Sequence, residues 1–128
     1  SSWPKVFRPA AGPRPPVPGR AAWMVELVVD REQFQAMVKE KLVIAYFTAE
    51  WCPPCHMMSP YFKELAESGT YDKAAFIKVD VDQAELIAEQ ADIEAMPTFQ
   101  VWTDGAKIDG FTGADMVRLK EFLDKHCR

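Results

Sequence analysis

Blocks of hydrophobic and polar positions alternate along most of the chain, and their lengths and periods predict alternating strands and helices. The segment 41–47, KLVIAYF, is a continuous apolar run rich in β-forming residues, which is typical of a strand buried on both faces. The segment 74–81, AAFIKVDV, has the same character, and the shorter run 23–29 predicts an earlier strand. Because helical patterns separate these runs, we expect parallel strands with helices covering the sheet.

The first helix is predicted directly after the run 23–29. Asp30 is placed to cap a helix that carries Phe34, Met37 and Val38 on one face. Gln33 stands three residues after Asp30, where a capping box has its second polar residue.

A second helix is predicted after the strand 41–47. Met58, Phe62 and Leu65 are spaced to share one face, and Gly69 lies near its end. Pro60 falls inside this helix, and we expect a kink there because proline removes one helical hydrogen bond.

The last third of the chain predicts a short helix, a hairpin and a final helix. The short helix covers residues 83–93, and two β runs flank a turn at residues 103–105. The final helix begins at about Ala114, and its apolar side is predicted to carry Met116, Leu119, Phe122 and Leu123. The full order is βαβαβαββα, which predicts an α/β fold with a central mixed sheet and helices on both faces.

Charge is unevenly distributed along the 128 residues, whose formal net charge is −4. Residues 1–23 contain four basic residues and no acidic one, so the remaining chain carries 11 basic and 19 acidic residues. An acidic domain without a basic stripe argues against nucleic-acid binding, which depends on clustered Lys and Arg. No apolar run approaches the roughly 20 residues that a membrane helix needs.

The segment 1–23 is distinct in composition, since it holds six of the ten prolines. Such a segment cannot bury enough apolar surface to form a core, so we expect a single domain of residues 24–128 preceded by a flexible leader. Three origins for the leader stay open: vector or upstream-translated sequence, a natural extension, or part of an organellar transit peptide.

Two of the three cysteines, Cys52 and Cys55, are separated only by Pro53 and Pro54, in the sequence AEWCPPC. A zinc site would need four ligands, and the remaining candidates lie at the far end of the chain or directly beside Cys55. A passive structural disulfide closing so short a loop would stabilise the fold only weakly. Neither interpretation explains the pair well.

A redox role has positive physical support. The pair follows a buried strand and opens a helix, where free backbone N–H groups and the helix dipole favour an anion. Pro53 directs Cys52 away from helical dihedral angles, which suits an N-cap position. We therefore expect Cys52 to be the exposed nucleophilic thiol, with a low pKa, and Cys55 to resolve the mixed disulfide from one turn further in.

These residues resemble the thioredoxin family. The resemblance rests on AEWCPPC after a buried strand, Pro60 in the next helix, the sequence Met-Pro-Thr at 96–98, and the later Gly105 and Gly113. It covers residues 24–127. The Pro-Pro pair replaces the more common Gly-Pro and resembles tryparedoxins and nucleoredoxins.

The resemblance implies a docking surface beside the two sulfurs. Pro97 would follow a cis peptide bond and face the dithiol, and Met96 would offer backbone hydrogen bonds to an extended substrate segment. Trp51 and Gly113 would complete a shallow apolar surface with Met96.

One position departs from the family pattern. The family carries a buried Asp six residues before the first cysteine, and here that residue is Tyr46. A phenol with a pKa of about 10 cannot supply a carboxylate base at neutral pH. Lys78, which would partner that Asp, would turn to solvent or to the Tyr46 hydroxyl, and Glu50, His56 or water would help proton transfer.

The third cysteine, Cys127, lies among Lys125, His126 and Arg128, which would lower a thiol pKa. We expect a flexible terminal thiol there without a special role.

The sequence thus predicts a thiol–disulfide oxidoreductase that reduces protein disulfides through Cys52 and Cys55. We expect a monomer with no bound cofactor or metal, and no nucleic-acid or membrane partner. Its electrons would come from a thioredoxin reductase or a low-molecular-weight dithiol. Three cysteines fit a reducing, cytoplasmic compartment, or an organelle if the leader is a transit-peptide remnant. The alternative is a thioredoxin-like binding module with weak or regulatory redox activity, which Tyr46 keeps open.

Overall fold

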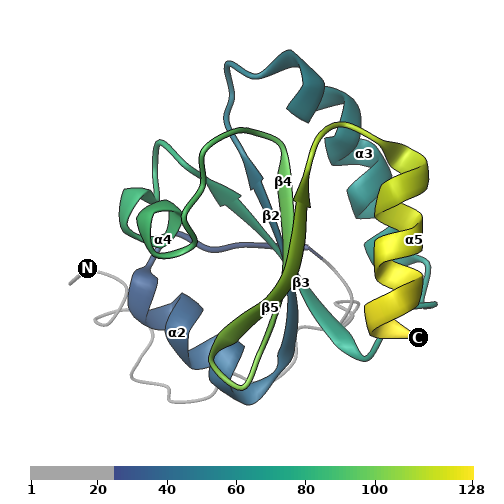
Figure 1. The fold of residues 1–128 in the computed structure, drawn as a ribbon, viewed down its shortest axis with the longest axis horizontal. Helices are drawn as coiled ribbons and strands as arrows, with labels where there is room; N and C mark the ends of the chain where they lie inside the picture. The colour runs from purple at the N-terminus through teal and green to yellow at the C-terminus, as the bar shows by residue number, and fades with distance from the viewer. Residues whose placement is uncertain (1–24) are drawn as a thin grey trace, which may run out of the picture.

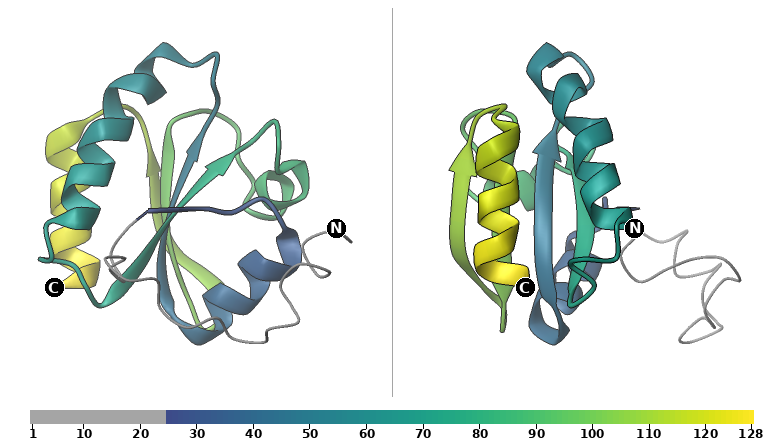
Figure 2. Two further views of the ribbon diagram at one scale, coloured as in Figure 1. Left: turned by 180° about the vertical axis from the view of Figure 1, so that it is seen from behind. Right: turned by 90° about the vertical axis from the view of Figure 1, so that its right-hand side faces the viewer.

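Five strands form one mixed sheet, with two helices on each of its faces (Figures 1 and 2). The computed structural model describes residues 25–128, so the expectations for the segment 1–23 lie outside the described residues. The strands are β1 (Glu26–Leu27), β2 (Leu42–Thr48), β3 (Ala74–Asp80), β4 (Thr98–Thr103) and β5 (Ala106–Thr112). The helices are α2 (Arg31–Glu40), α3 (Pro53–Glu67), α4 (Glu85–Gln90) and α5 (Met116–Cys127).

The sheet order is β1-β3-β2-β4-β5, and the first three strands are parallel. β4 is antiparallel to β2, and β5 is antiparallel to β4, so β5 runs in the same direction as β2. The predicted mixed sheet and its helices on both faces are therefore confirmed. Because β2 and β3 are parallel neighbours, Thr48 and Asp80 end them side by side. The loops that follow β2 and β3, the start of β4 and the end of β5 thus meet at one end of the sheet (Figure 1).

Alternating side chains of β2 divide the core into two layers. Ile44 and Tyr46 point into a cluster beneath α3 and α5, which also holds Phe62 and Phe99. The odd-numbered neighbours on β2 point into the opposite cluster beneath α2 and α4. A strand with both faces buried needs a continuous apolar sequence, which explains the run 41–47.

The hairpin is confirmed, and its turn depends on two residues with positive φ. Asp104 has φ 54° and Gly105 has φ 82°, both in the left-handed region. The Gly105 N–H donates to the Val38 carbonyl at 2.8 Å, which holds the hairpin turn against the end of α2.

Some local predictions were wrong. The first strand has only two residues, Glu26–Leu27, rather than spanning 23–29. Asp30 caps α2 by accepting from the Glu32 N–H, but the Gln33 amide donates to Glu26 instead of closing a capping box. Met116 is 43% exposed, because it begins α5 and lies off its buried face.

Pro60 lies inside α3, which runs through it from residue 53 to residue 67. Proline has no N–H to donate, so the backbone carbonyl four residues earlier loses its usual helical partner. No helix within residues 25–128 is long and apolar enough to cross a membrane.

Candidate active site

Cys52 and Cys55 form a disulfide where β2 passes into α3. Cys52 is the N-cap of the helix with extended dihedral angles, and Pro53 and Pro54 fill the first turn. Proline suits these positions because its missing N–H would have no helical partner. The Cys55 N–H is close enough to donate to the Cys52 sulfur, at 3.3 Å.

Both cysteines are buried, and this corrects the prediction that Cys52 is an exposed side chain. Cys52 is 4% exposed and Cys55 is 1% exposed in the disulfide-bonded state. Ala49 forms a small buried cluster with them, against which Val81 and Met96 pack. A client sulfur can therefore reach the pair only from the Cys52 side or after local movement.

The segment Met96–Pro97 lies against this cluster, as expected. The peptide bond between the two residues is cis, and Pro97 is buried. The Pro97 carbonyl accepts a hydrogen bond from the Gly113 N–H at 2.9 Å, which joins the segment to the loop before α5. Gly113 has φ 130°, a conformation that side-chain-bearing residues rarely adopt.

Trp51 lies immediately before Cys52 and is 64% exposed. Its indole N–H donates to the Asp82 carboxylate at 2.7 Å, so the ring is held in place from the loop after β3. A large exposed aromatic ring fixed by a hydrogen bond is a preorganised contact surface.

Tyr46 lies beneath the start of α3 and is fully buried. Its ring stacks on Phe99 at 5.0 Å, and its hydroxyl reaches the Cys55 carbonyl at 2.6 Å and the Ser59 hydroxyl at 2.7 Å. Ser59 also reaches the Cys55 carbonyl, at 3.0 Å. The hydroxyls of Tyr46 and Ser59 thus make these three contacts with two protons. Through the Tyr46 hydroxyl, the Cys55 carbonyl is bonded to a residue of the sheet.

Lys78 lies beside Tyr46 on β3. No hydrogen bond or ion pair joins the Lys78 ammonium group to another residue of the range 25–128, so of the two expected outcomes, solvent or the Tyr46 hydroxyl, the contact with the hydroxyl is not formed. The hydroxyl is instead satisfied from α3.

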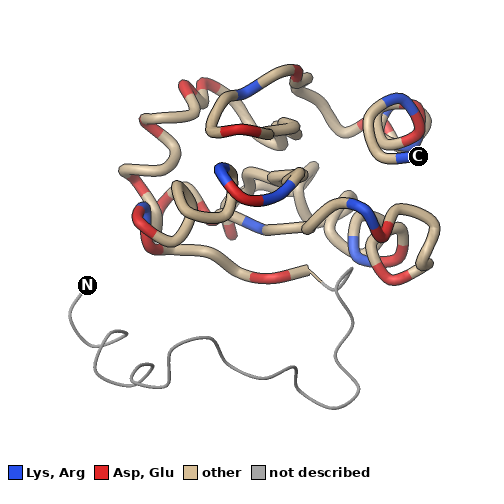
Figure 3. Tube along the Cα trace, turned by 90° about the horizontal axis from the view of Figure 1, so that it is seen from below, with Lys and Arg blue, Asp and Glu red and all other residues tan. Residues whose placement is uncertain are grey.

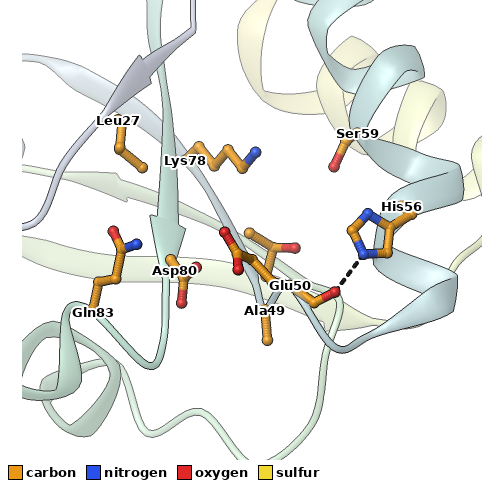
Figure 4. Close-up of a pocket in the computed structure, with 9 residues that line it drawn as sticks. Leu27, Ala49, Glu50, His56, Ser59, Lys78, Asp80 and Gln83 are labelled. Carbon is orange, nitrogen blue, oxygen red and sulfur yellow. Dashed lines mark hydrogen bonds between the residues drawn. The ribbon is translucent and has the colours of Figure 1, made fainter.

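A polar pocket of about 130 Å³ lies between α3 and the ends of β2 and β3 (Figure 4). Glu50, His56, Ser59, Lys78 and Asp80 line it together with four other residues. This space is large enough for several water molecules. The His56 ring donates from Nε2 to the Glu50 carbonyl, because a carbonyl oxygen can only accept.

Asp80 and Ser59 were not among the predicted site residues. Asp80 is only 7% exposed, and one of its carboxylate oxygens accepts from the Asp82 N–H at 2.9 Å. The pairing of β2 with β3 could in principle have indicated that Asp80 lies at the site. Tyr46 and Thr48 pair with Lys78 and Asp80, so the polar positions of both strands share one face.

Cys127 corrects a further expectation. It is 1% exposed and packs in the cluster beneath α3 and α5, rather than being a flexible terminal thiol. Burial raises the pKa of this thiol to about 12, the opposite of the shift that its basic sequence neighbours predicted.

No group of three or more His, Cys, Asp or Glu residues is arranged to hold a metal ion within the described part of the chain. The comparisons with known proteins identify the kind of site. The sequence model of the Thioredoxin family matches residues 25–125. The chain belongs to the thioredoxin family.

Individual thioredoxins agree with this assignment. A thioredoxin of Ictalurus punctatus is 41% identical over 106 residues, covering 80% of this chain and 99% of that protein. Thioredoxin 1 of Plasmodium falciparum is 38% identical over 105 residues, covering 81% and 99%. The crystal structure of Malassezia sympodialis thioredoxin superposes with a TM-score of 0.78 at 37% identity, covering 81% of this chain and 91% of that one.

The disulfide-bonded pair and the family together make this thioredoxin a thiol–disulfide oxidoreductase, a disulfide reductase whose redox centre is the CxxC sequence. Proteins of this family act without a bound cofactor and interact with disulfide substrates and thioredoxin reductase.

Proposed function

We propose that Cys52 is the attacking sulfur and Cys55 the resolving sulfur in the reduction of disulfides in partner proteins. The N-cap position of Cys52 supports this order, because a thiolate there lies against the positive end of a helix of 15 residues. Cys55 lies one turn inside α3 and is the more deeply buried of the two.

The reaction passes two electrons from the dithiol to the client. The Cys52 thiolate attacks one client sulfur, so a Cys52–client disulfide forms, the client bond breaks, and the released client thiolate takes up a proton. Deprotonated Cys55 then attacks the Cys52 sulfur, which re-forms the Cys52–Cys55 disulfide and releases the second client thiolate. A thioredoxin reductase or a low-molecular-weight dithiol returns two electrons and two protons to the pair.

Trp51, Met96, Pro97 and Gly113 form the docking surface in this proposal. The contacts of Met96 with the cysteine cluster and the bond between Pro97 and Gly113 support it. An extended client segment would lie along residues 96–97 and pair with the backbone of Met96, as in strand addition.

The proton of Cys55 must leave before it can attack. Glu50 and His56 are the proposed acceptors because both line a pocket that can hold water beside α3, and Lys78 in the same pocket favours negative charge. Tyr46 serves in positioning, since its hydroxyl is bonded to the Cys55 carbonyl.

The protein functions as a monomer without a bound cofactor in this proposal. The cytoplasm is the proposed compartment, or an organelle if residues 1–23 derive from a transit peptide.

The proposed order of the two sulfurs is tested by trapping. Cys55→Ser should accumulate mixed disulfides with client proteins through Cys52, whereas Cys52→Ser should accumulate none. Wild type should accelerate the reduction of insulin by dithiothreitol, and Cys52→Ser should abolish the acceleration. Equal rates for wild type and Cys52→Ser would refute the enzymatic role, and trapping by Cys52→Ser alone would reverse the two roles.

A further inference from the structure

Acidic residues gather at the end of the molecule that carries the disulfide, and the sequence segments that form this end contain no Lys or Arg. Three segments lie at or beside this end: the β2–α3 connection, the stretch from the end of β3 to Pro97, whose helix α4 lies to one side near α2, and the loop from β5 into α5 (Figure 1). Within residues 42–62, 79–97 and 110–117 there is no Lys or Arg. The same segments contain eight acidic residues: Glu50, Asp80, Asp82, Glu85, Glu89, Asp92, Glu94 and Asp115.

All of these acidic residues except Asp80 are exposed. No ion pair within residues 25–128 involves any of the eight, so bases of the same domain do not neutralise them. Arg118 stacks its guanidinium over the Phe111 ring at 4.8 Å. Lys78 lines the pocket behind α3 together with Glu50 and Asp80, so it is a base near these acidic residues, and it makes no ion pair with either carboxylate within residues 25–128.

The opposite end of the sheet differs in its charge pattern. Seen from that end in Figure 3, basic and acidic positions are interspersed along the tube. Lys41 and Lys73 precede β2 and β3 there, and Lys107 lies at the start of β5. The negative field is therefore concentrated where a client must approach.

Two of the acidic groups lie directly beside the proposed docking surface. The Asp82 carboxylate holds the Trp51 indole, and Glu94 is an exposed residue two positions before Met96. Trp51 adds a large apolar surface, 64% exposed. An apolar patch with a single-sign charged rim fits a segment of complementary composition.

We propose that this thioredoxin selects client disulfides flanked by Lys or Arg in an extended segment with apolar residues, and that it discriminates against acidic clients. The proposal rests on the function proposed above, since it concerns the docking surface of the same redox pair. The acidic rim would increase the association rate of basic segments and repel acidic ones, and a partner with a mixed or acidic surface would gain nothing from it.

The test compares two peptides that contain the same cystine and apolar residues and differ only in flanking Lys or flanking Glu. The full chain is the catalyst, and kcat/KM for each peptide is divided by its rate constant with dithiothreitol, which corrects for the reactivity of the peptide disulfide itself. At an ionic strength of about 0.01 M, where the Debye length is about 30 Å, we expect the Lys peptide to be preferred by on the order of tenfold. At about 1 M salt, where the Debye length is about 3 Å, the preference should approach one.

Glu94→Lys should reduce the low-salt preference about twofold or more, because it reverses a charge beside the docking surface. The matched control is Asp72→Lys, which makes the same change of net charge at an exposed residue of the α3–β3 turn, at the opposite end of the sheet. Asp72→Lys should leave the preference nearly unchanged.

The outcomes separate this proposal from the one on which it rests. If both peptides are reduced with equal corrected kcat/KM at low salt, the disulfide reductase stands and the selectivity is refuted. An equal effect of Glu94→Lys and Asp72→Lys would also refute it, because overall charge rather than the acidic rim would then be responsible. Failure to reduce either peptide faster than the uncatalysed control would refute the proposed function itself.

Discussion

At the scale of single residues, Tyr46 determines how this thioredoxin differs from the family pattern. A carboxylate at this position would be a base, whereas the phenol is a hydrogen-bond partner for the backbone of the second cysteine. The Ser59 hydroxyl shares that carbonyl, and Pro60 removes a helical donor one residue further along. The Tyr46 hydroxyl thus connects the first turns of α3 to the sheet through Cys55 and Ser59.

Tyr46→Phe should keep the stack on Phe99 and remove the hydroxyl contacts. The expected loss in the free energy of unfolding is about 1 kcal/mol, the usual net value of one such bond. Urea denaturation of the oxidised protein measures it. Tyr61→Phe is the matched control, because no hydrogen bond from the Tyr61 hydroxyl to residues 25–128 is present. An equal loss in both variants would show that the contacts with Cys55 and Ser59 contribute nothing particular.

Tyr46→Asp tests whether a missing carboxylate limits turnover. The variant loses a fully buried ring, which should lower the free energy of unfolding by about 3–5 kcal/mol. Lys78, its neighbour in register, becomes available as a partner for the new carboxylate. If proton removal from Cys55 is slow in wild type, resolution of the mixed disulfide should become faster near neutral pH. An unchanged rate constant in a folded variant would show that groups already present accept the proton.

If Glu50 and His56 accept the proton of Cys55, their removal should change how the rate of the resolving step depends on pH. Glu50→Gln and His56→Gln together should slow the resolving step below neutral pH while leaving the attack by Cys52 unchanged. Stopped-flow measurement of the two steps on a small disulfide separates them. Similar slowing of both steps would assign these side chains to local structure rather than to proton transfer from Cys55.

At the scale of helices and strands, the N-caps were predictable only in part. Asp30 was recognised because an apolar period follows it, whereas Asp115 was missed because the final helix was expected to begin at about Ala114, two residues before its actual start at Met116. The Asp115 side chain accepts from the Arg118 N–H at 3.0 Å and so fixes the start of α5 at Met116.

Asp115→Ala should therefore destabilise the protein by about 1 kcal/mol, as expected for loss of an N-cap. The free energy of unfolding from urea titration checks this value. Asp72→Ala is the control, since Asp72 is exposed and caps no helix. An equally small effect of both substitutions would mean that the cap does not stabilise α5.

At the scale of the whole molecule, the sequence predicted the architecture because its apolar runs had strand length and its helical spacing was regular. The redox pair could be predicted from its local sequence, and the cis peptide bond before Pro97 from the resemblance to the thioredoxin family. Burial could not. Cys127 reads as a terminal thiol among charged neighbours, yet the helical period places it on the buried side of α5 with Leu119 and Leu123. The pocket lined by Asp80 was missed for a related reason, because it depends on the register between two strands.

The burial of Cys127 also predicts a pH dependence of stability. Its pKa is raised to about 12 in the folded protein, whereas a thiol of the unfolded chain ionises at about 8.5. The folded state therefore holds its proton longer, and stability should fall as the pH rises from about 8.5 towards 12. Cys127→Ala should flatten this part of the stability curve, as measured by urea denaturation at several pH values. The same slope in wild type and variant would show that other groups, such as Tyr71, whose pKa is also raised to about 12, account for it.

The buried position of Cys127 gives the protein an internal reporter of its own opening. After mild reduction, an alkylating reagent should modify Cys52 first and leave Cys127 unmodified until α5 separates from the sheet. The rate at which Cys127 is labelled then measures how often that separation occurs, much as amide exchange reports local unfolding. No probe has to be introduced, so the same mass-spectrometric measurement can follow each variant above and distinguish local loosening of the site from opening of the whole domain.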